Sequence, residues 1–244
     1  MGLQKDEAVA LRRLDYSENS QILVFFGREH GQLRLIAKGI KRGTKKAFAV
    51  GIDLLERGSV VFVGSEGRSG LGTVTEWRQV DPYLGLRTDA RRLYAGQYTA
   101  EITSQLTEPY DPHPDLYEGL TELLGDLAGG APTMARVVCF QLRLLASVGL
   151  MPILDRCAAC GRAAATGRLT HFSSAAGGMI CRDCEPAIVE KRRADPRVPA
   201  ALVAGDVPEP LAVPAFDLLN YAISQAMGKP SRLAPYLVAP GLLA

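Results

Sequence analysis

The first eighty residues follow a pattern of short apolar or alternating runs that is typical of β-strands. Five such runs recur at nearly regular spacing, at 8–13, 21–26, 32–35, 59–63 and 71–77. Gly27 and Gly31 bracket a five-residue turn between the second and third runs, which indicates a hairpin. Five strands in so short a segment predict a small barrel. The five-stranded OB type is favoured, and an SH3-like barrel is the alternative.

After residue 80 the pattern changes to helical periodicity. Apolar residues recur every three or four positions, which predicts helices at 89–102, 114–127 and 133–148. Further on, the pattern predicts a short helix at 185–193, a proline-rich linker or extended strap at 195–214, and a helix at 216–227. The expected fold class is therefore multidomain α+β. An OB-type barrel domain spans residues 1–80, and an α-helical domain spans 81–244.

Two Cys-x-x-Cys pairs in the helical part carry the clearest chemical signal. Two residues between cysteines let one tight turn aim both sulfurs at a single ion, and two such turns complete a tetrahedron. The expected ligands are Cys157, Cys160, Cys181 and Cys184. Four thiolates leave no open position for water, so the spacing predicts one structural zinc ion in an inserted module at 153–186. Two disulfides, a redox pair and an iron–sulfur cluster are the alternatives. His171, between the pairs, is expected to be a bystander.

The composition is that of an ordinary soluble protein, with 47% hydrophobic and 22% charged residues. No apolar run reaches the roughly 18 residues needed to cross a bilayer, and the N-terminus lacks the layout of a signal peptide. These features predict a protein of the reducing cytoplasm with no membrane partner, where thiolates are free to bind metal. The fifth cysteine, Cys139, falls in an apolar helical pattern and is expected to be a buried, inert thiol.

Positive charge gathers in the predicted barrel. Residues 1–80 carry 13 Lys+Arg and 9 Asp+Glu, whereas the remainder carries 15 and 17. The segment 38–46, between the third and fourth predicted strands, holds five cations and no acid. Alone it would be a solvated loop, but on an OB barrel it favours binding of a nucleic-acid backbone by counterion release. The candidate nucleic-acid-binding residues are Lys38, Lys41, Arg42, Lys45 and Lys46 of the loop and Arg12, Arg13, Arg28 and Arg34 of the strands.

The sequence offers little for base recognition or catalysis. The strand aromatics Phe25, Phe26, Phe62 and Trp77 are expected in the barrel core, which favours sequence-neutral backbone binding. The chain lacks the Lys-x-Asp-Gly motif of DNA ligases and the Gly-x-x-x-x-Gly-Lys-Ser/Thr phosphate loop. Its three histidines show no spacing that suggests a shared site. These absences argue against an enzyme that processes nucleic acids.

Several segments, taken in order, resemble the RecO family of recombination mediators. The N-terminal part of the resemblance consists of Tyr16-Ser17-Glu18, Ile22-Leu23-Val24-Phe25-Phe26, Glu29-His30-Gly31, Ala37-Lys38-Gly39-Ile40-Lys41-Arg42 and Gly70-Leu71-Gly72-Thr73. The C-terminal part consists of the first cysteine pair with Gly161, Phe172-Ser173, and Gly177-Gly178 before the second pair. The resemblance covers most of the chain and weakens after about residue 190. Residues 47–50 depart from the Pro-Phe step that many members show after the basic loop.

The resemblance implies a DNA repair and recombination mediator without enzymatic activity. Such a protein binds single- and double-stranded DNA and anneals complementary strands. With RecR it helps to load RecA onto strands coated by the single-strand binding protein SSB, which the helical domain binds. The implied place of action is the cytoplasm, at the nucleoid. An RNA-binding regulator with an OB fold and zinc is the alternative function, and a nucleic-acid-processing enzyme is a weaker one.

Overall fold

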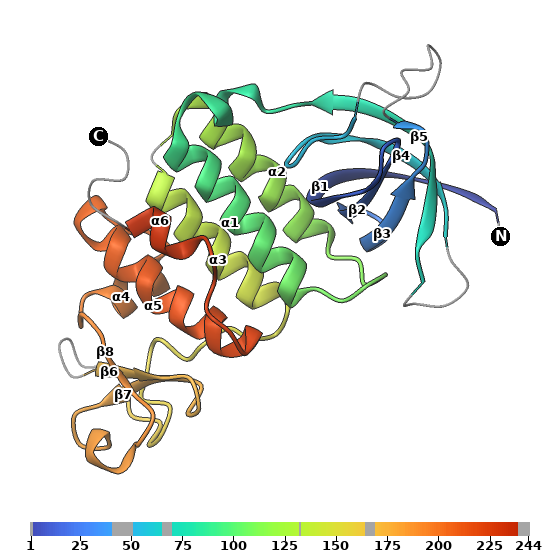
Figure 1. Cartoon of the computed structure of the whole chain (residues 1–244). Helices are drawn as coiled ribbons and strands as arrows, with labels where there is room; N and C mark the ends of the chain where they lie inside the picture. Colours follow the sequence, from blue (N-terminus) through green and yellow to red (C-terminus); the bar gives the residue numbers. More distant parts are fainter. Residues whose placement is uncertain (1, 41–50, 65–69, 132, 164–168, 239–244) are drawn as a thin grey trace. The chain divides into compact units, whose positions relative to one another are not determined.

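The computed structural model describes residues 2–40, 51–64, 70–131, 133–163 and 169–238 (Figure 1). The described chain forms two compact units, of which the first runs to Ala131 and the second holds the residues after it. The first unit contains a barrel and two long helices, and the second contains helices and a small sheet. The domain division after residue 80, placed where strands give way to helices, stays a prediction.

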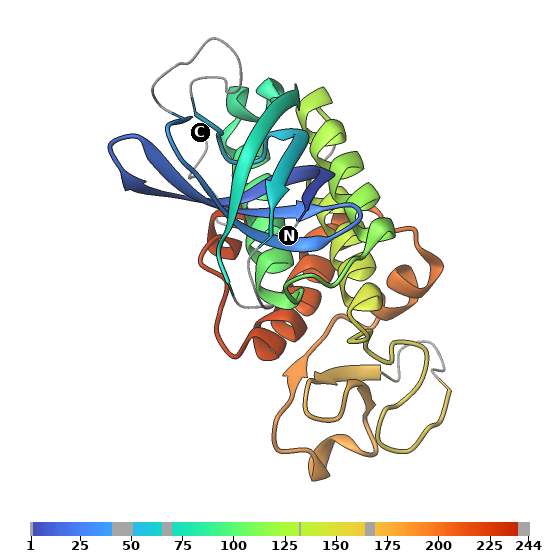
Figure 2. The ribbon, with the colours of Figure 1, turned by 90° about the vertical axis from the view of Figure 1, so that its right-hand side faces the viewer.

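Five strands of the first unit form a closed barrel in the order β1-β2-β3-β5-β4 (Figure 2). Neighbouring strands are antiparallel except β3 and β5, whose parallel pairing completes the closure. The strands are β1 (Leu3–Ser17), β2 (Ser20–Gly27), β3 (Gly31–Ala37), β4 (Arg57–Val63) and β5 (Gly72–Asp81). Each of the five predicted runs overlaps one of these strands. The predicted OB-type barrel is confirmed.

Alternation along the strands decides which side chains fill the barrel. Leu23 and Phe25 of β2 point into the core, where they meet Leu33 and Leu35 of β3. The rings of Phe25 and Trp77 have centroids 5.2 Å apart. Phe26 and Phe62 are also fully buried. The predicted place in the barrel core is therefore confirmed for Phe25, Phe62 and Trp77, whereas Phe26 is buried on the outer face of the barrel.

The hairpin between β2 and β3 is held at its turn by a buried carboxylate. Asp6 accepts hydrogen bonds from the backbone N–H groups of Glu29, at 3.1 Å, and His30, at 3.0 Å. It also lies 3.0 Å from Nδ1 of His30. Gly31 adopts a φ of 66°, in the left-handed region that glycine tolerates without a Cβ clash. The hairpin expected between Gly27 and Gly31 is confirmed.

Helices α1 (Ala90–Leu106) and α2 (Pro114–Gly129) complete the first unit and pack against each other (Figure 1). The Asp89 carboxylate accepts from the backbone N–H groups of Arg91 and Arg92, which satisfies two donors at the start of α1. Gly130 ends α2 in a left-handed conformation. Both helices were predicted by the periodic spacing of apolar residues.

The second unit is built on α3 (Thr133–Ser147) and α5 (Glu209–Met227), which pack against each other. The shorter helix α4 (Val198–Ala204) packs on α5, and α6 (Ala234–Val238) follows. A three-stranded sheet in the order β7-β6-β8 lies between α3 and α4 in the chain. Its strands are β6 (Leu169–Ser173), β7 (Gly178–Cys181) and β8 (Arg192–Arg193).

Two predictions for the second unit are wrong. Residues 185–193 form a 3₁₀ turn at Glu185–Ala187 and then β8, because backbone pairing with β6 outweighs the local helical pattern. The proline-rich segment contains α4 and the first turns of α5. Its prolines Pro199 and Pro210 lie in the first turn of each helix, where the missing N–H has no helical acceptor to lose.

Candidate nucleic-acid interface and metal centre

A row of three residues crosses the outside of the barrel. Arg12 of β1 lies opposite Val24 of β2, which lies opposite Arg34 of β3. Directly opposed residues in a sheet share a face, and the alternating positions, such as Leu23 and Leu35, point into the core. Arg12 and Arg34 are exposed, and neither forms an ion pair with another described residue. Within the described part of the chain, this arginine row therefore presents two guanidinium groups without an ion-pair partner to solvent.

The next row on the same face is apolar. Leu14, Ile22 and Ile36 lie opposite one another on β1, β2 and β3. Leu14 is 63% exposed, whereas Ile36 is only 8% exposed. An apolar strip bordered by cations suits a single nucleic-acid strand, whose backbone is charged and whose bases have apolar faces.

The opposite end of this outer face is covered by helix α1. Val9, Phe26 and Gln32 form the in-register row there, and all three are buried. The side-chain amide of Gln32 donates to the carbonyls of Ser104, at 3.2 Å, and Thr107, at 3.0 Å. These carbonyls lie at the C-terminal end of α1, where helical partners are lacking. The helix closes this end and leaves the arginine row open.

Arg13 and Arg28, which the sequence also assigned to the interface, are engaged in ion pairs. Arg13 lies 2.7 Å from one oxygen of Asp53, and Arg87 lies 2.7 Å from the other. Burial alone would raise the pKa of Asp53, but the hydrogen bonds and charges of its partners outweigh it and hold that pKa below its ordinary value. Arg28 pairs at 2.7 Å with Glu118 of α2. These carboxylates neutralise part of the expected positive surface.

The basic loop is described only at its beginning. Lys38 follows β3 directly and is exposed. The other loop candidates, Lys41, Arg42, Lys45 and Lys46, lie outside the described residues, and their role stays a prediction.

An exposed aromatic ring that the sequence analysis did not assign lies near the end of the β1–β2 hairpin. Tyr16 is 65% exposed and stands two residues from Leu14, at a β-bulge between Asp15 and Ser17. The strand pattern alone does not tell whether an aromatic residue is buried or exposed. The one signal for exposure of Tyr16 was its nearness to the polar turn after Ser17.

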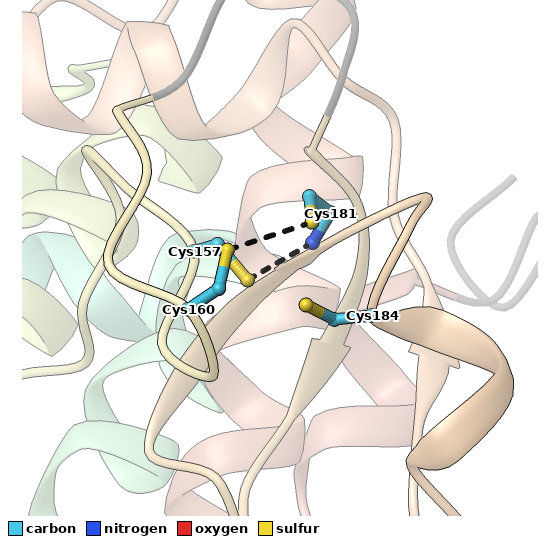
Figure 3. Close-up of side chains that lie close together, drawn as sticks. All are labelled: Cys157, Cys160, Cys181 and Cys184. Atoms are coloured by element: carbon cyan, nitrogen blue, oxygen red, sulfur yellow. Dashed lines mark hydrogen bonds between the residues drawn. The ribbon is translucent and has the colours of Figure 1, made fainter.

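Four cysteine side chains converge in the second unit (Figure 3). Their sulfur atoms all lie within 4.8 Å of one another, and Sγ of Cys160 is 3.9 Å from Sγ of Cys181. Zinc–sulfur bonds of about 2.3 Å at tetrahedral angles place sulfurs about 3.8 Å apart. The predicted ligands are therefore brought together, and their separation fits one metal ion bound by four thiolates.

Each cysteine pair lies on a tight turn. In the first turn the N–H of Gly161 donates to the carbonyl of Cys157 at 2.8 Å, with Gly161 at a φ of 72°. In the second turn the N–H of Cys184 donates to the carbonyl of Cys181 at 3.1 Å. Because β7 ends at Cys181, the small sheet delivers the second turn to the first.

Two thiols of the cluster, Cys157 and Cys184, have pKa values shifted in opposite directions. Burial raises the pKa of Cys157, but backbone N–H groups of Cys181, Cys160 and Ala159 outweigh burial and lower this pKa to about 6. The N–H of Cys181 lies 3.4 Å from the Cys157 sulfur. Hydrogen bonds with the thiols of Cys181 and Cys160 raise the pKa of Cys184 to about 12. Four neighbouring thiolates repel one another, and a metal ion removes that repulsion.

Two other predictions concern residues near this cluster. His171 lies on β6, with Nδ1 3.0 Å from the Thr170 hydroxyl, and is not among the clustered ligands. Cys139 is exposed on α3, so the prediction of a buried thiol is wrong. Successive helical residues are rotated by about 100°, so the buried neighbours Val138 and Phe140 point away from Cys139 on both sides.

Comparison with known proteins covers both units. The family model "Recombination protein O N terminal" matches residues 1–83, and "Recombination protein O C terminal" matches residues 87–230. A DNA repair protein RecO of Listeria monocytogenes is 30% identical over 182 residues, covering 75% of this chain and 69% of the relative. RecO of Rhodopirellula baltica is 26% identical, covering 94% and 97%, and RecO of Myxococcus xanthus is 28% identical, covering 97% and 98%.

The fold and the two sites define an OB-barrel protein with accompanying helices and a four-cysteine centre. No described helix is both long and apolar enough to span a bilayer. The chain belongs to the RecO family, because the two family models together account for most of its length. DNA repair and recombination are therefore the processes in which it acts.

Proposed function

We propose that this protein is a recombination mediator that binds single- and double-stranded DNA and anneals complementary strands without turning over a substrate. With RecR, it helps to load RecA onto SSB-coated single strands at the nucleoid. Family membership supports this assignment. The structural observation that supports binding to the DNA backbone is the open arginine row. Arg12 and Arg34 present cations that no described carboxylate neutralises.

Annealing follows from charge compensation. Two complementary strands repel through their phosphates, and cations bound along one backbone lower the cost of bringing the second one close. Arginine and lysine contacts to phosphate carry no sequence information, so they serve any pair of strands. Contacts of this kind also leave the hydrogen-bonding edges of the bases free to find each other.

We infer that the cysteine cluster holds one structural zinc ion. Cys157, Cys160, Cys181 and Cys184 supply four sulfur ligands, the set typical of structural zinc sites. The ion would fix the two turns and the end of β7, because metal binding and folding are coupled in small modules of this kind. The helical domain predicted at 81–244 is the proposed binding region for SSB, on the strength of the family resemblance.

An annealing assay tests the proposed function. Complementary DNA strands coated with SSB are mixed with the protein in the absence of any nucleotide, and duplex formation is followed by fluorescence. We expect duplex to form faster than with SSB alone. An identical experiment on naked strands separates annealing itself from the handling of SSB. No acceleration in either experiment, or binding confined to RNA, would contradict the proposal.

A further inference from the structure

The β1–β2 hairpin carries two large apolar side chains that face solvent. Leu14 is 63% exposed and Tyr16 is 65% exposed. Strand β4 pairs with β1 only over Leu3–Val9, so the later residues of β1 have β2 as their one strand neighbour in the described chain. In Figure 2 this dark-blue hairpin projects from the barrel. Two large exposed apolar side chains two residues apart on a projecting element make it a candidate binding surface.

The register of the sheet aligns this surface with the arginine row. Leu14 lies opposite Ile22, and Ile22 lies opposite Ile36, two positions along the strands from Arg12 and Arg34. At about 3.3 Å of rise per residue, the apolar row and the arginine row run parallel about 7 Å apart. Proteins that bind single strands combine a cationic track for phosphates with a surface for bases, and this face offers both.

We propose that Leu14, Tyr16 and Ile22, here called the hairpin platform, receive unpaired bases of a strand whose phosphates contact the arginine row. This inference rests on the proposed function and adds contact with bases to contact with backbone. Packing against base faces is tolerant of sequence and leaves the pairing edges free. In a duplex the base faces are stacked inside, so the hairpin platform favours single strands.

Oligothymidylate and an abasic oligonucleotide of equal length and charge test this directly. Because the stacking of one base on an aromatic ring contributes about 1–3 kcal/mol and Tyr16 supplies one ring, we expect the wild-type protein to bind oligothymidylate at least about fivefold more tightly than the abasic strand. Tyr16→Ala and Leu14→Ser should bring this ratio close to one and leave the affinity for the abasic strand unchanged. Tyr16→Phe should retain the ratio. Leu84→Ser, at a residue 66% exposed on the 3₁₀ helix Leu84–Thr88, is the matched control and should also retain it.

A spectroscopic measurement separates base contact from general weakening. The single tryptophan, Trp77, is buried, so the indole introduced by Tyr16→Trp reports on the hairpin platform. We expect oligothymidylate to quench its emission and the abasic strand to leave it unchanged. Equal affinity of the wild-type protein for both strands would overturn the hairpin platform and leave the proposed function standing. Failure to bind either strand would overturn both. An unchanged ratio in Tyr16→Ala and Leu14→Ser, together with loss of RecR association, would assign the surface to a protein partner and overturn base contact.

Discussion

Removing both arginines of the arginine row should change how DNA binding depends on salt. Each phosphate neutralised on a single strand contributes about 0.7 to the slope of log affinity against log salt. Arg12 and Arg34 are exposed and unpaired among the described residues, so each is available to one phosphate. The Arg12→Ala, Arg34→Ala double variant should therefore lose about 1.4 from the magnitude of the slope. Anisotropy titrations of a labelled oligonucleotide across a series of salt concentrations measure it.

Arg28→Ala is the matched control, because it removes one exposed arginine that already pairs with Glu118 at 2.7 Å. Its slope should change by less than about 0.7, the value for one full phosphate contact. Substitution of exposed arginines changes stability by less than about 0.5 kcal/mol, so thermal unfolding should stay close to wild type. A wild-type slope in the double variant would refute the assignment of the arginine row. An equal loss in Arg28→Ala would show that ion pairing does not decide which arginines bind.

Three further predictions concern the metal centre and the barrel. Elemental analysis should find one zinc ion per chain in the native protein. The Cys181→Ser, Cys184→Ser variant should lose this zinc, and Cys139→Ser, a control at an exposed thiol, should keep it. Native protein without metal would contradict the site. Because the pKa of Asp53 is lowered in the folded protein, its ion pairs stabilise above about pH 4 and fade as the pH falls through that lowered pKa. Asp53→Asn should thus lower the free energy of unfolding by less than about 1 kcal/mol at neutral pH. Denaturant titrations should show that the difference from wild type disappears at acidic pH. Asp6→Asn places an amide donor against backbone N–H groups and should cost about 1–3 kcal/mol in the same measurement; a wild-type midpoint would show that the hairpin turn does not depend on this carboxylate.

Local signals explain what could be predicted from the sequence. Period-two runs and the glycines of the β2–β3 turn are encoded within a few residues, so the barrel was predictable. The cysteine ligands were predictable for the same reason, since two residues between cysteines define a metal-binding turn. The segment 195–214 was misinterpreted because proline is tolerated before a helix and in its first turn, where most of these prolines lie. Pro214 lies inside α5, which continues past it. The apolar neighbours of Cys139 suggested a buried thiol. The rotation of about 100° between successive helical residues places this thiol on the exposed side of α3.

The charges of the candidate interface could not be sorted from the sequence, because their partners are distant along the chain. Asp53 lies 40 residues from Arg13, and Glu118 lies 90 residues from Arg28. Nothing near either arginine signals that a carboxylate will reach it. In the sequence, the exposed arginines of the arginine row cannot be told from the ion-paired ones. Only the register of β1, β2 and β3 shows that Arg12 and Arg34 lie in one row.

The extent of the interface is set by what covers the rest of the same face. Val24 and Phe26 lie on the same face of β2, yet Phe26 is fully buried and Val24 stands in the open row. Exposing Phe26 together with Val9, both fully buried, would cost about 3–6 kcal/mol at 1.5–3 kcal/mol for each side chain. The hydrogen bonds from Gln32 to the end of α1 would be lost as well. A nucleic-acid strand gains only a few kcal/mol from one or two contacts, so it cannot displace α1 to reach the covered end. The packing of α1 thus confines a strand that follows this face to the arginine row and the hairpin platform.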